Sequence, residues 1–421
     1  MTTSLNRNIA PPIKQPELPK IMPNSIKRNH EITVFDISEN EEISRFDIIF
    51  NIGKLHENKA GILKIVNSTI LSGTSEKTEA EVNDSLDMLG IYHSIEQSLY
   101  ETTITIFGTN ALIKDAIPIL IDAVFNASFP SDKINNAVKK AIAGLEQNKE
   151  KTSYLAKTLL NEIFYATKSI KNETTKEDFM AINQAELYEY YHQVFLKSSF
   201  YIIKPASVDL EKLHLPENTT IALGINKSYH FTRNIVPHTH IQKNDAVQTS
   251  IRGRCIAIGR QDMDYPILQL ANTIWGGFFG ALLMKNIREE KGLTYGISSY
   301  LSPNFDQGTI ELSADISINN IDLVLSEIKK EIENLHQNTF DLDIFLKAKN
   351  YLLGNIAKSY DEIFANLEKY KLIYSEELPE NYHQTYFESI KNCTLEKMTA
   401  VAKKYIRFDL FSFVTCGPEK Q

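Results

Sequence analysis

Cysteine is scarce in this chain, and its spacing excludes two classes of site. Among 421 residues there are three cysteines, Cys255, Cys393 and Cys416. They are odd in number, far apart, and form no C-x-x-C pair, so we expect neither a disulfide framework nor a thiolate metal site. Their placement favours buried thiols in a reduced compartment.

The sequence also lacks a surplus of positive charge and any long apolar run. Lysine and arginine total 45 against 53 aspartate and glutamate residues, and this net charge of −8 argues against a nucleic-acid-binding protein. No window is apolar enough to span a membrane, and the N-terminal residues hold no apolar segment of signal-peptide length. We therefore expect a cytoplasmic protein without a membrane or nucleic-acid partner.

What the sequence does contain is an internal repeat. Residues 102–106 (TTITI) and 308–312 (GTIEL) have strand patterns and lie 206 positions apart. Apolar helices are predicted before them, at 60–72 and 265–275, and two further helices after each, starting near 110 and 133 in the first copy and near 319 and 343 in the second. Paired strands and runs of helices favour an α+β fold with two homologous domains, each an antiparallel or mixed sheet with helices on one face.

The repeat and the composition divide the chain into four predicted segments. These are a proline-rich N-terminal arm at 1–24, a first α+β domain at 25–205, an interdomain linker at 206–240 and a second α+β domain at 241–421. The arm is expected either to wrap the body or a partner, or to be a disordered tail.

The stretch REEKGLTYGISSY, which begins at Arg288, contains the first candidate site residues. Lys291 and Gly292 predict a helix end, because a cation in the last turn and a following glycine are typical of helix C-termini. Two interpretations of Arg288 and Tyr295 are open: a solvated charge run followed by a core tyrosine, or a pair directed at a substrate.

The stretch IWGGFFGALL, at 274–283, is rich in glycine but matches no phosphate-binding loop, because no G-K-[ST] follows. One interpretation is a break between helices with close backbone packing. The other is a flexible apolar loop that contacts a peptide through Gly276, Gly277, Phe278 and Phe279.

The order of these features resembles the pitrilysin-type inverted zincins, the family of the mitochondrial processing peptidases. The resemblance rests on 60–91 in the first half, and on DAVQTSI (245–251), DYPILQLANTIWGG (264–277) and IREEKGLTYGISS (287–299) in the second. It covers nearly the whole chain after residue 25. It implies half of a clamshell that closes around an unfolded peptide.

The resemblance also implies that this chain has lost the family's zinc site. Catalytic members carry H-x-x-E-H on the first long helix and a later glutamate as third ligand. The corresponding positions here include Lys64, Asn67 and Ser68, and the later position falls near Gly144, so every ligand and the general base are missing. A catalytic zinc needs three protein ligands, and the cation of Lys64 would repel a metal ion. We therefore expect no metal in this chain.

The arginine and tyrosine of the family are retained as Arg288 and Tyr295. In some bacterial members one chain carries the zinc motif and a second chain, which lacks it, supplies this pair. The resemblance thus implies the zinc-less subunit of a heterodimeric metallopeptidase, with the zinc held by a paralogous partner. A homodimer of the isolated chain is compatible with it.

Two other functions are weighed against this one. A non-proteolytic binding or scaffold protein of the same fold would have no evident need for both Arg288 and Tyr295. A self-sufficient peptidase would need a site that the sequence does not display. The resemblance therefore implies peptidase activity only in the complex.

Overall fold

The computed structural model describes residues 25–29, 32–37, 42–166, 173–205, 208–209, 215, 235–304, 307–360 and 364–419. The arm at 1–24 and most of the linker at 206–240 lie outside the described residues, and their boundaries stay predictions. None of the helices within these ranges combines the length and the apolar character that crossing a membrane requires.

Each half of the chain builds one mixed sheet. The six-stranded sheet has the order β1-β2-β6-β3-β5-β4, in which β2 and β6 are parallel and the other neighbours antiparallel. Its strands are β1 (Ser25–Asn29), β2 (Ile32–Ile37), β3 (Ile43–Phe50), β4 (Tyr92–Gln97), β5 (Thr102–Thr109) and β6 (Phe200–Pro205).

The five-stranded sheet has the order β7-β11-β8-β10-β9, again with one parallel pair, β7 and β11. Its strands are β7 (Thr239–Gln242), β8 (Thr249–Ile258), β9 (Thr294–Asn304), β10 (Gln307–Ile316) and β11 (Ser412–Gly417). Apart from β1, the two orders correspond strand for strand, so the predicted repeat and the α+β fold are confirmed. In both sheets the last strand of the order, β4 or β9, is an edge strand.

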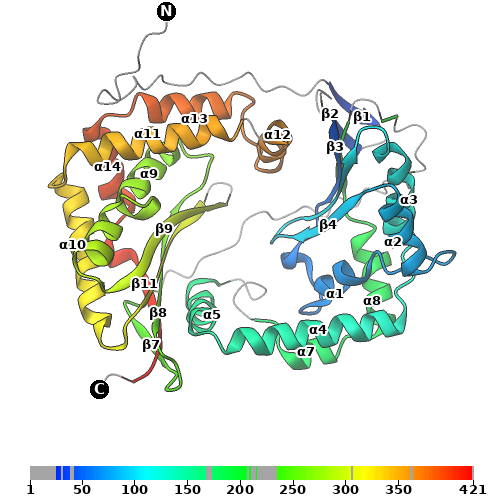
Figure 1. The fold of residues 1–421 in the computed structure, drawn as a ribbon, viewed down its shortest axis with the longest axis horizontal. Coiled ribbons are helices and arrows are strands. Elements are labelled where there is room, and N and C mark those ends of the chain that lie inside the picture. The colour runs from blue at the N-terminus through cyan, green and yellow to red at the C-terminus, as the bar shows by residue number, and fades with distance from the viewer. Residues whose placement is uncertain are drawn as a thin grey trace, which may run out of the picture.

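The helices follow the same repeat (Figure 1). Those of the first half are α1 (Ile62–Thr69), α2 (Glu79–Met88), α3 (Ile113–Phe125), α4 (Ser131–Lys149), α5 (Thr152–Phe164), α7 (Lys176–Met180) and α8 (Gln184–Tyr190). Those of the second half are α9 (Tyr265–Asn272), α10 (Ile321–Gln337), α11 (Leu342–Lys358), α12 (Ala365–Ser375), α13 (Tyr382–Lys391) and α14 (Leu395–Tyr405). Each predicted helix is present.

Strand alternation assigns the two faces of each sheet to different partners. In β3, the side chains of Phe46, Ile48 and Phe50 are fully buried in the main core of the first half, beneath its helices. Ile49 points to the opposite face and belongs to a separate small cluster. The second half has its own core, which contains the chain's single tryptophan, Trp275. All three cysteines are free and buried, as predicted, and burial raises the pKa of each thiol.

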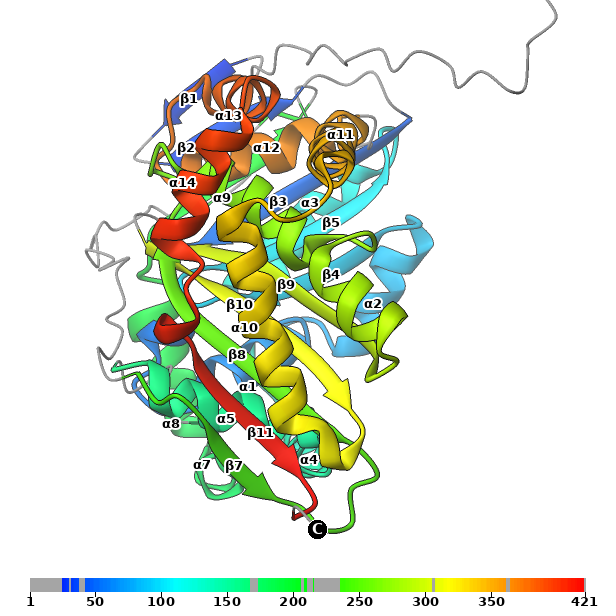
Figure 2. The same cartoon turned by 90° about the vertical axis from the view of Figure 1, so that its left-hand side faces the viewer.

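The opposite face of each sheet is covered by one helix from the other half, in an exchange that Figures 1 and 2 show. Helix α5 leaves the first half and packs on β8 and β11, where Ala156 and Leu160 meet Val414 and Cys416. Sequence analysis did not predict α5 or its contact with the second sheet.

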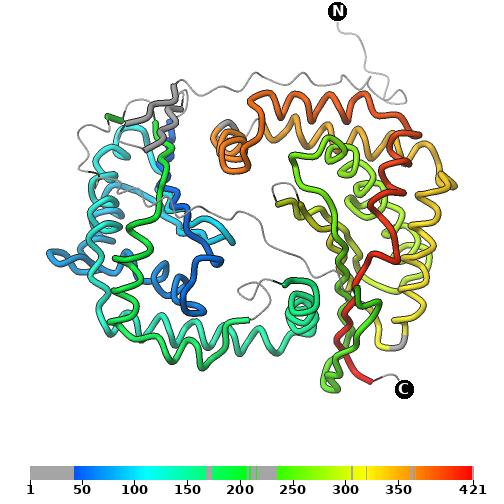
Figure 3. Tube along the Cα trace, turned by 180° about the vertical axis from the view of Figure 1, so that it is seen from behind, coloured from blue at the N-terminus to red at the C-terminus, as the bar shows by residue number. Residues whose placement is uncertain are grey.

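Helix α12 makes the reciprocal contact with the first sheet (Figure 3). Its Leu367 packs in the cluster with Ile49 of β3, and Lys371 Nζ donates to Thr103 Oγ1 at 2.9 Å. Arg45 Nη1 and Glu368 Oε1 form an ion pair at 2.5 Å. The two halves are therefore joined by packed side chains as well as by the covalent linker.

Candidate functional site

The segment that carries Arg288 and Tyr295 is a helix end followed by an edge strand. A π-helical turn spans Met284–Glu290, and β9 begins at Thr294. Gly292 between them has a φ of +62°, a left-handed conformation that glycine adopts without strain, and its N–H donates to Arg288 O at 3.1 Å. The predicted glycine cap is therefore confirmed.

Tyr295 is a surface residue and not a core tyrosine. Its side chain is 88% exposed, whereas Ile297, on the same strand, is 1% exposed. Arg288 is half-buried, and its guanidinium carbon lies 4.9 Å from the centre of the Phe279 ring, a cation–π distance. Phe279 is itself 66% exposed. The interpretation of this stretch as a charge run followed by a core tyrosine is therefore wrong for Tyr295, because its side chain is not buried.

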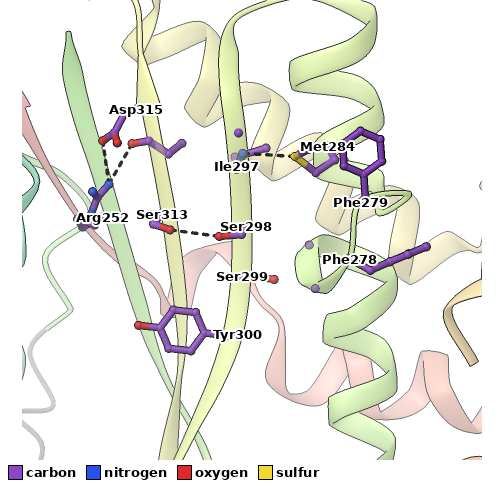
Figure 4. A pocket seen from close by; sticks show the side chains of 14 residues that line it. Arg252, Phe278, Phe279, Met284, Ile297, Ser298, Ser299, Tyr300, Ser313 and Asp315 are labelled. Atoms are coloured by element: carbon purple, nitrogen blue, oxygen red, sulfur yellow. Dashed lines mark hydrogen bonds and ion pairs between the residues drawn. The ribbon is translucent and has the colours of Figure 1, made fainter. Parts of the chain in front are cut away.

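A pocket of about 620 Å³ lies beside this pair, between the glycine-rich stretch and the strands β9 and β10 (Figure 4). All four residues predicted from that stretch line it: Gly276, Gly277, Phe278 and Phe279. The opposite wall is polar, with Ser298 and Ser313 bonded to each other and an ion pair of 3.2 Å between Arg252 and Asp315. Arg288 contacts the lining residue Phe279 through its guanidinium, and Tyr295 directly precedes the lining residue Gly296, but neither Arg288 nor Tyr295 is itself a lining residue.

Gly276 explains how the glycine-rich stretch can lie flat on β9. A Cβ atom there would stand 2.5 Å from Ser299 Oγ and 3.0 Å from Ser299 N, closer than atoms can approach. Asn272 ties the same strand down, because its Nδ2 donates to Ser299 O at 3.1 Å and its Oδ1 accepts from Ser299 Oγ at 2.8 Å. Close backbone packing is therefore confirmed, and peptide contact by the pocket stays a prediction.

The former zinc-motif positions border a second pocket, of about 560 Å³, between α1 and β4. Lys64, Asn67 and Ser68 share one face of α1 and line it. Gly144 does not line it. Its neighbour Leu145 lines a smaller adjoining pocket of about 250 Å³, together with Lys64. Lys64, Asn67 and Ser68 thus line one pocket. Of the fourth position, Gly144 on α4, only the neighbour Leu145 lines the adjoining pocket.

The start of α1 is fixed by a half-buried carboxylate, that of Glu57. Glu57 accepts the backbone N–H groups of Gly61 at 3.1 Å and Leu63 at 3.3 Å, which are donors without partners inside the helix. Burial raises the pKa of Glu57, and these hydrogen bonds, the charge of Lys54 and a hydrogen bond from Gln97 oppose the rise. Glu57 therefore holds the N-terminus of α1, the helix that carries Lys64, Asn67 and Ser68.

Among the pocket residues that sequence reasoning missed are Lys54, Gln97 and Arg252. Arg252 and Gln97 lie in strands β8 and β4, Lys54 lies in a short 3-10 helix after β3, and no motif marks any of them. Strand alternation could have placed Arg252 on the face opposite the core. Lys54 and Gln97 meet α1 only because the first sheet brings the ends of β3 and β4 to it.

Metal analysis gives a direct prediction for this site. Within the described ranges, no three His, Cys, Asp or Glu side chains gather as metal ligands would. The chain purified alone, without chelator, is expected to contain well under one zinc per chain, because Lys64 places a positive charge at a former ligand position. Atomic emission spectrometry after dialysis against buffer checks this, and one tightly held zinc per chain would overturn it.

Comparison with known proteins gives the family. Residues 33–178 match the insulinase family (peptidase family M16), and residues 226–352 match the peptidase M16 inactive domain. A protein of Rickettsia bellii named "uncharacterized zinc protease" is 23% identical over 355 residues, which cover 80% of this chain and 81% of that one. The Helicobacter pylori "non-peptidase homolog YmxG" is 22% identical over 379 residues, which cover 87% of this chain and 86% of that one.

A solved structure, the peptidase M16 inactive domain from Pseudomonas fluorescens, shares the fold with a TM-score of 0.83 at 20% identity, covering 94% of this chain and 99% of that one. Two sheets whose strand orders correspond apart from β1, an arginine–tyrosine pair in the second half and no zinc motif on α1 are the features of a two-domain homologue of the zinc peptidases. The chain belongs to peptidase family M16. The family that the sequence resembles is thereby confirmed.

Proposed function

We propose that this chain is the zinc-less subunit of a cytoplasmic heterodimeric zinc peptidase. It supplies Arg288 and Tyr295 in trans to the zinc site of a paralogous partner. The observation that carries the proposal is the 88% exposure of Tyr295 beside an open pocket. A large aromatic residue so exposed on an edge strand gains little from folding, whereas a residue that acts on a second chain must be exposed in the isolated one.

The proposed role of Arg288 and Tyr295 is to donate hydrogen bonds to the negative charge that develops on the carbonyl oxygen. The partner's zinc would supply the activated water that attacks a peptide carbonyl. The Tyr295 hydroxyl and the Arg288 guanidinium are both donors, and donors aimed at the carbonyl oxygen stabilise the transition state more than the ground state. Arginine stays protonated at any working pH, so its contribution does not titrate away.

The substrate class follows from the edge strands. β4 and β9 each pair with a strand on one side, which leaves backbone donors and acceptors on the other side for an added strand. An unfolded peptide can add there through main-chain hydrogen bonds, a mode that tolerates many sequences. At β9, Phe278 and Phe279 offer apolar contact to its side chains. Folded proteins cannot present such an extended segment.

The competing function is a binding or scaffold protein of the same fold with no part in proteolysis. One relative is named a non-peptidase homolog, which is the observation in favour of it. The exposure of Tyr295 and the stacking of Arg288 on an exposed ring weigh against it, because a scaffold has no use for donors held at the mouth of a pocket.

Association with a zinc-bearing paralogue tests the proposal. The chain is co-expressed with each M16 paralogue of its organism that carries H-x-x-E-H, and complexes are weighed by size-exclusion chromatography with light scattering. We expect a one-to-one complex with one of them. A chain that elutes alone in every combination would leave only the scaffold function.

A further inference from the structure

The pocket at the former zinc-motif positions carries positive charge of its own. Lys64 comes from α1, Lys54 from the segment after β3, and Gln97 from β4. These two lysines are the only charged residues among the residues that line this pocket. Within the described part of the chain neither ammonium group has a carboxylate oxygen within 4.0 Å, although Lys54 acts electrostatically on Glu57 and Glu173.

The acidic residues near the pocket are already engaged or lie outside it. Glu57 and Glu173 do not line this pocket but the smaller adjoining one, which Lys54 and Lys64 also line. Glu57 is occupied by two backbone N–H groups and by Gln97, and burial raises the pKa of both carboxyl groups. Gln97 in turn accepts from Asn67 Nδ2 at 3.3 Å. Lys64 Nζ lies 5.4 Å from the centre of the Phe179 ring, a cation–π distance, but within the described ranges neither ammonium group has an ion-pair partner. The two lysines therefore provide the positive charge of the larger pocket.

The place of the pocket in the fold indicates what kind of anion reaches it. Ile95 and Gln97 of the edge strand β4 line its wall, and the turn residues Ser98 and Leu99 close one end. Except for Ile95, every residue of β4 is exposed. A peptide added along β4 would therefore pass the two lysines. The pocket holds neither arginine nor glycine among its lining residues, so it lacks the forked donors and the close backbone approach typical of phosphate sites.

We propose that this pocket binds a carboxylate of a peptide lying along β4, held by the ammonium groups of Lys54 and Lys64. The carboxylate is either the peptide's C-terminus or an acidic side chain. Ile95 and Leu99 would contact the apolar part of the same residue. The inference takes its ligand class, an unfolded peptide, from the proposed function, but it requires neither the partner chain nor zinc.

The test uses the purified full chain alone and a fluorescein-labelled unstructured peptide in three forms. These are a free C-terminal acid, its C-terminal amide, and the amide with one internal glutamate. Binding is followed by fluorescence anisotropy. Hydrogen bonds to a charged group are worth about 1.5–3 kcal/mol, so we expect the free acid or the glutamate peptide to bind roughly 10- to 100-fold more tightly than the plain amide. Which of the two shows the preference identifies the source of the carboxylate.

Variants of the two lysines test whether this pocket causes the preference for a carboxylate-bearing peptide. Lys64→Gln and Lys54→Gln keep a polar side chain and remove the charge, and each is expected to abolish most of the preference. Lys64→Arg should retain it. Lys114→Gln, an exposed lysine on α3, is the matched control and should bind as the native chain does. Equal affinity for all three peptides, or a preference that survives in both glutamine variants, would overturn the proposal. A failure to find the partner peptidase would leave this result unaffected.

Discussion

Replacing Tyr295 by phenylalanine is expected to lower the kcat of the assembled peptidase by roughly 10²- to 10³-fold, the usual cost of removing one oxyanion donor. Arg288→Ala should have an effect of similar size. The substitution at Tyr295 removes one oxygen from a side chain that is 88% exposed, so the stability of the fold should not change. The measurement is steady-state hydrolysis of an unstructured fluorogenic peptide by the complex.

Two matched variants control for the chemistry of the substitutions. Tyr188→Phe removes a hydroxyl from a half-exposed tyrosine on α8, in the other half of the chain. Arg407→Ala removes an exposed arginine, 47% accessible and paired with Asp409. Arg407 precedes β11, which β8 and β10 separate from β9 in the sheet. Both are expected to leave kcat within about twofold of the native complex, because neither contacts the pocket beside Tyr295.

The kinetic pattern separates a catalytic role from a binding role. A donor that acts only on the developing charge lowers kcat and kcat/KM together, whereas a contact with the bound substrate raises KM alone. We expect the first pattern for Tyr295→Phe, with unchanged assembly and unchanged zinc content of the partner. Full activity in both Tyr295→Phe and Arg288→Ala complexes would return the pair to a structural role.

Replacing Arg254 by alanine is expected to destabilise the second half by about 3–5 kcal/mol. Arg254 is 4% exposed and its Nε donates to Glu311 at 2.6 Å. Burial disfavours the charge on its guanidinium, but the charges and hydrogen bond of its neighbours, Glu311 first, raise its pKa. Removal of the arginine leaves the Glu311 carboxylate buried and unpaired, which costs more than the pair itself contributes.

The same residue holds the exchanged helix α5 in place. Its Nη1 donates to Asn161 at 2.9 Å, and its guanidinium lies 5.4 Å from the centre of the Phe164 ring and 5.0 Å from that of Tyr165. We therefore expect Arg254→Ala to loosen the contact between the halves as well. Limited proteolysis within α5 should become faster in this variant.

Urea unfolding followed by tryptophan fluorescence measures the free energy of unfolding of Arg254→Ala and the native chain. Trp275 is the only tryptophan and is fully buried in the core of the second half, so its signal reports that half. The double variant Arg254→Met with Glu311→Leu should recover most of the loss, because an apolar pair leaves no buried charge. Arg407→Ala, which breaks an exposed pair, should cost at most about 1 kcal/mol. A loss below that value for Arg254→Ala would contradict the expected role.

The sequence was sufficient for the repeat and for the helices α1, α3, α4, α9, α10 and α11, because strand alternation and helical spacing are local properties. It could not predict the exchange of α5 and α12. The pattern of Ala156 and Leu160 shows that α5 has an apolar face but not which sheet that face covers. Such a choice depends on the linker path and on contacts far apart in the chain, such as that of Leu367 with Ile49.

The candidate site also contains residues that the sequence predicts and residues that only the folded structure brings together. Arg288, Tyr295 and the four residues from Gly276 to Phe279 follow from contiguous motifs. The four residues line one pocket, and Arg288 stacks on one of them, Phe279. Lys54 lies in no motif, and its closeness to Lys64 arises only when β3 and α1 are packed. Gly144, the predicted third ligand position, lines neither pocket, and its neighbour Leu145 lines the smaller one together with Lys64.

The most direct test of the central claim is a titration of the zinc-bearing partner with this chain. Peptide hydrolysis is measured at fixed partner concentration while this chain is added. The account predicts little activity for the partner alone and a rise that saturates at one chain per partner. With the Tyr295→Phe chain, saturation should occur at the same ratio with a kcat roughly 10²- to 10³-fold lower. Full activity of the partner alone, or equal plateaus with the native and Tyr295→Phe chains, would contradict the claim that this subunit supplies the pair in trans.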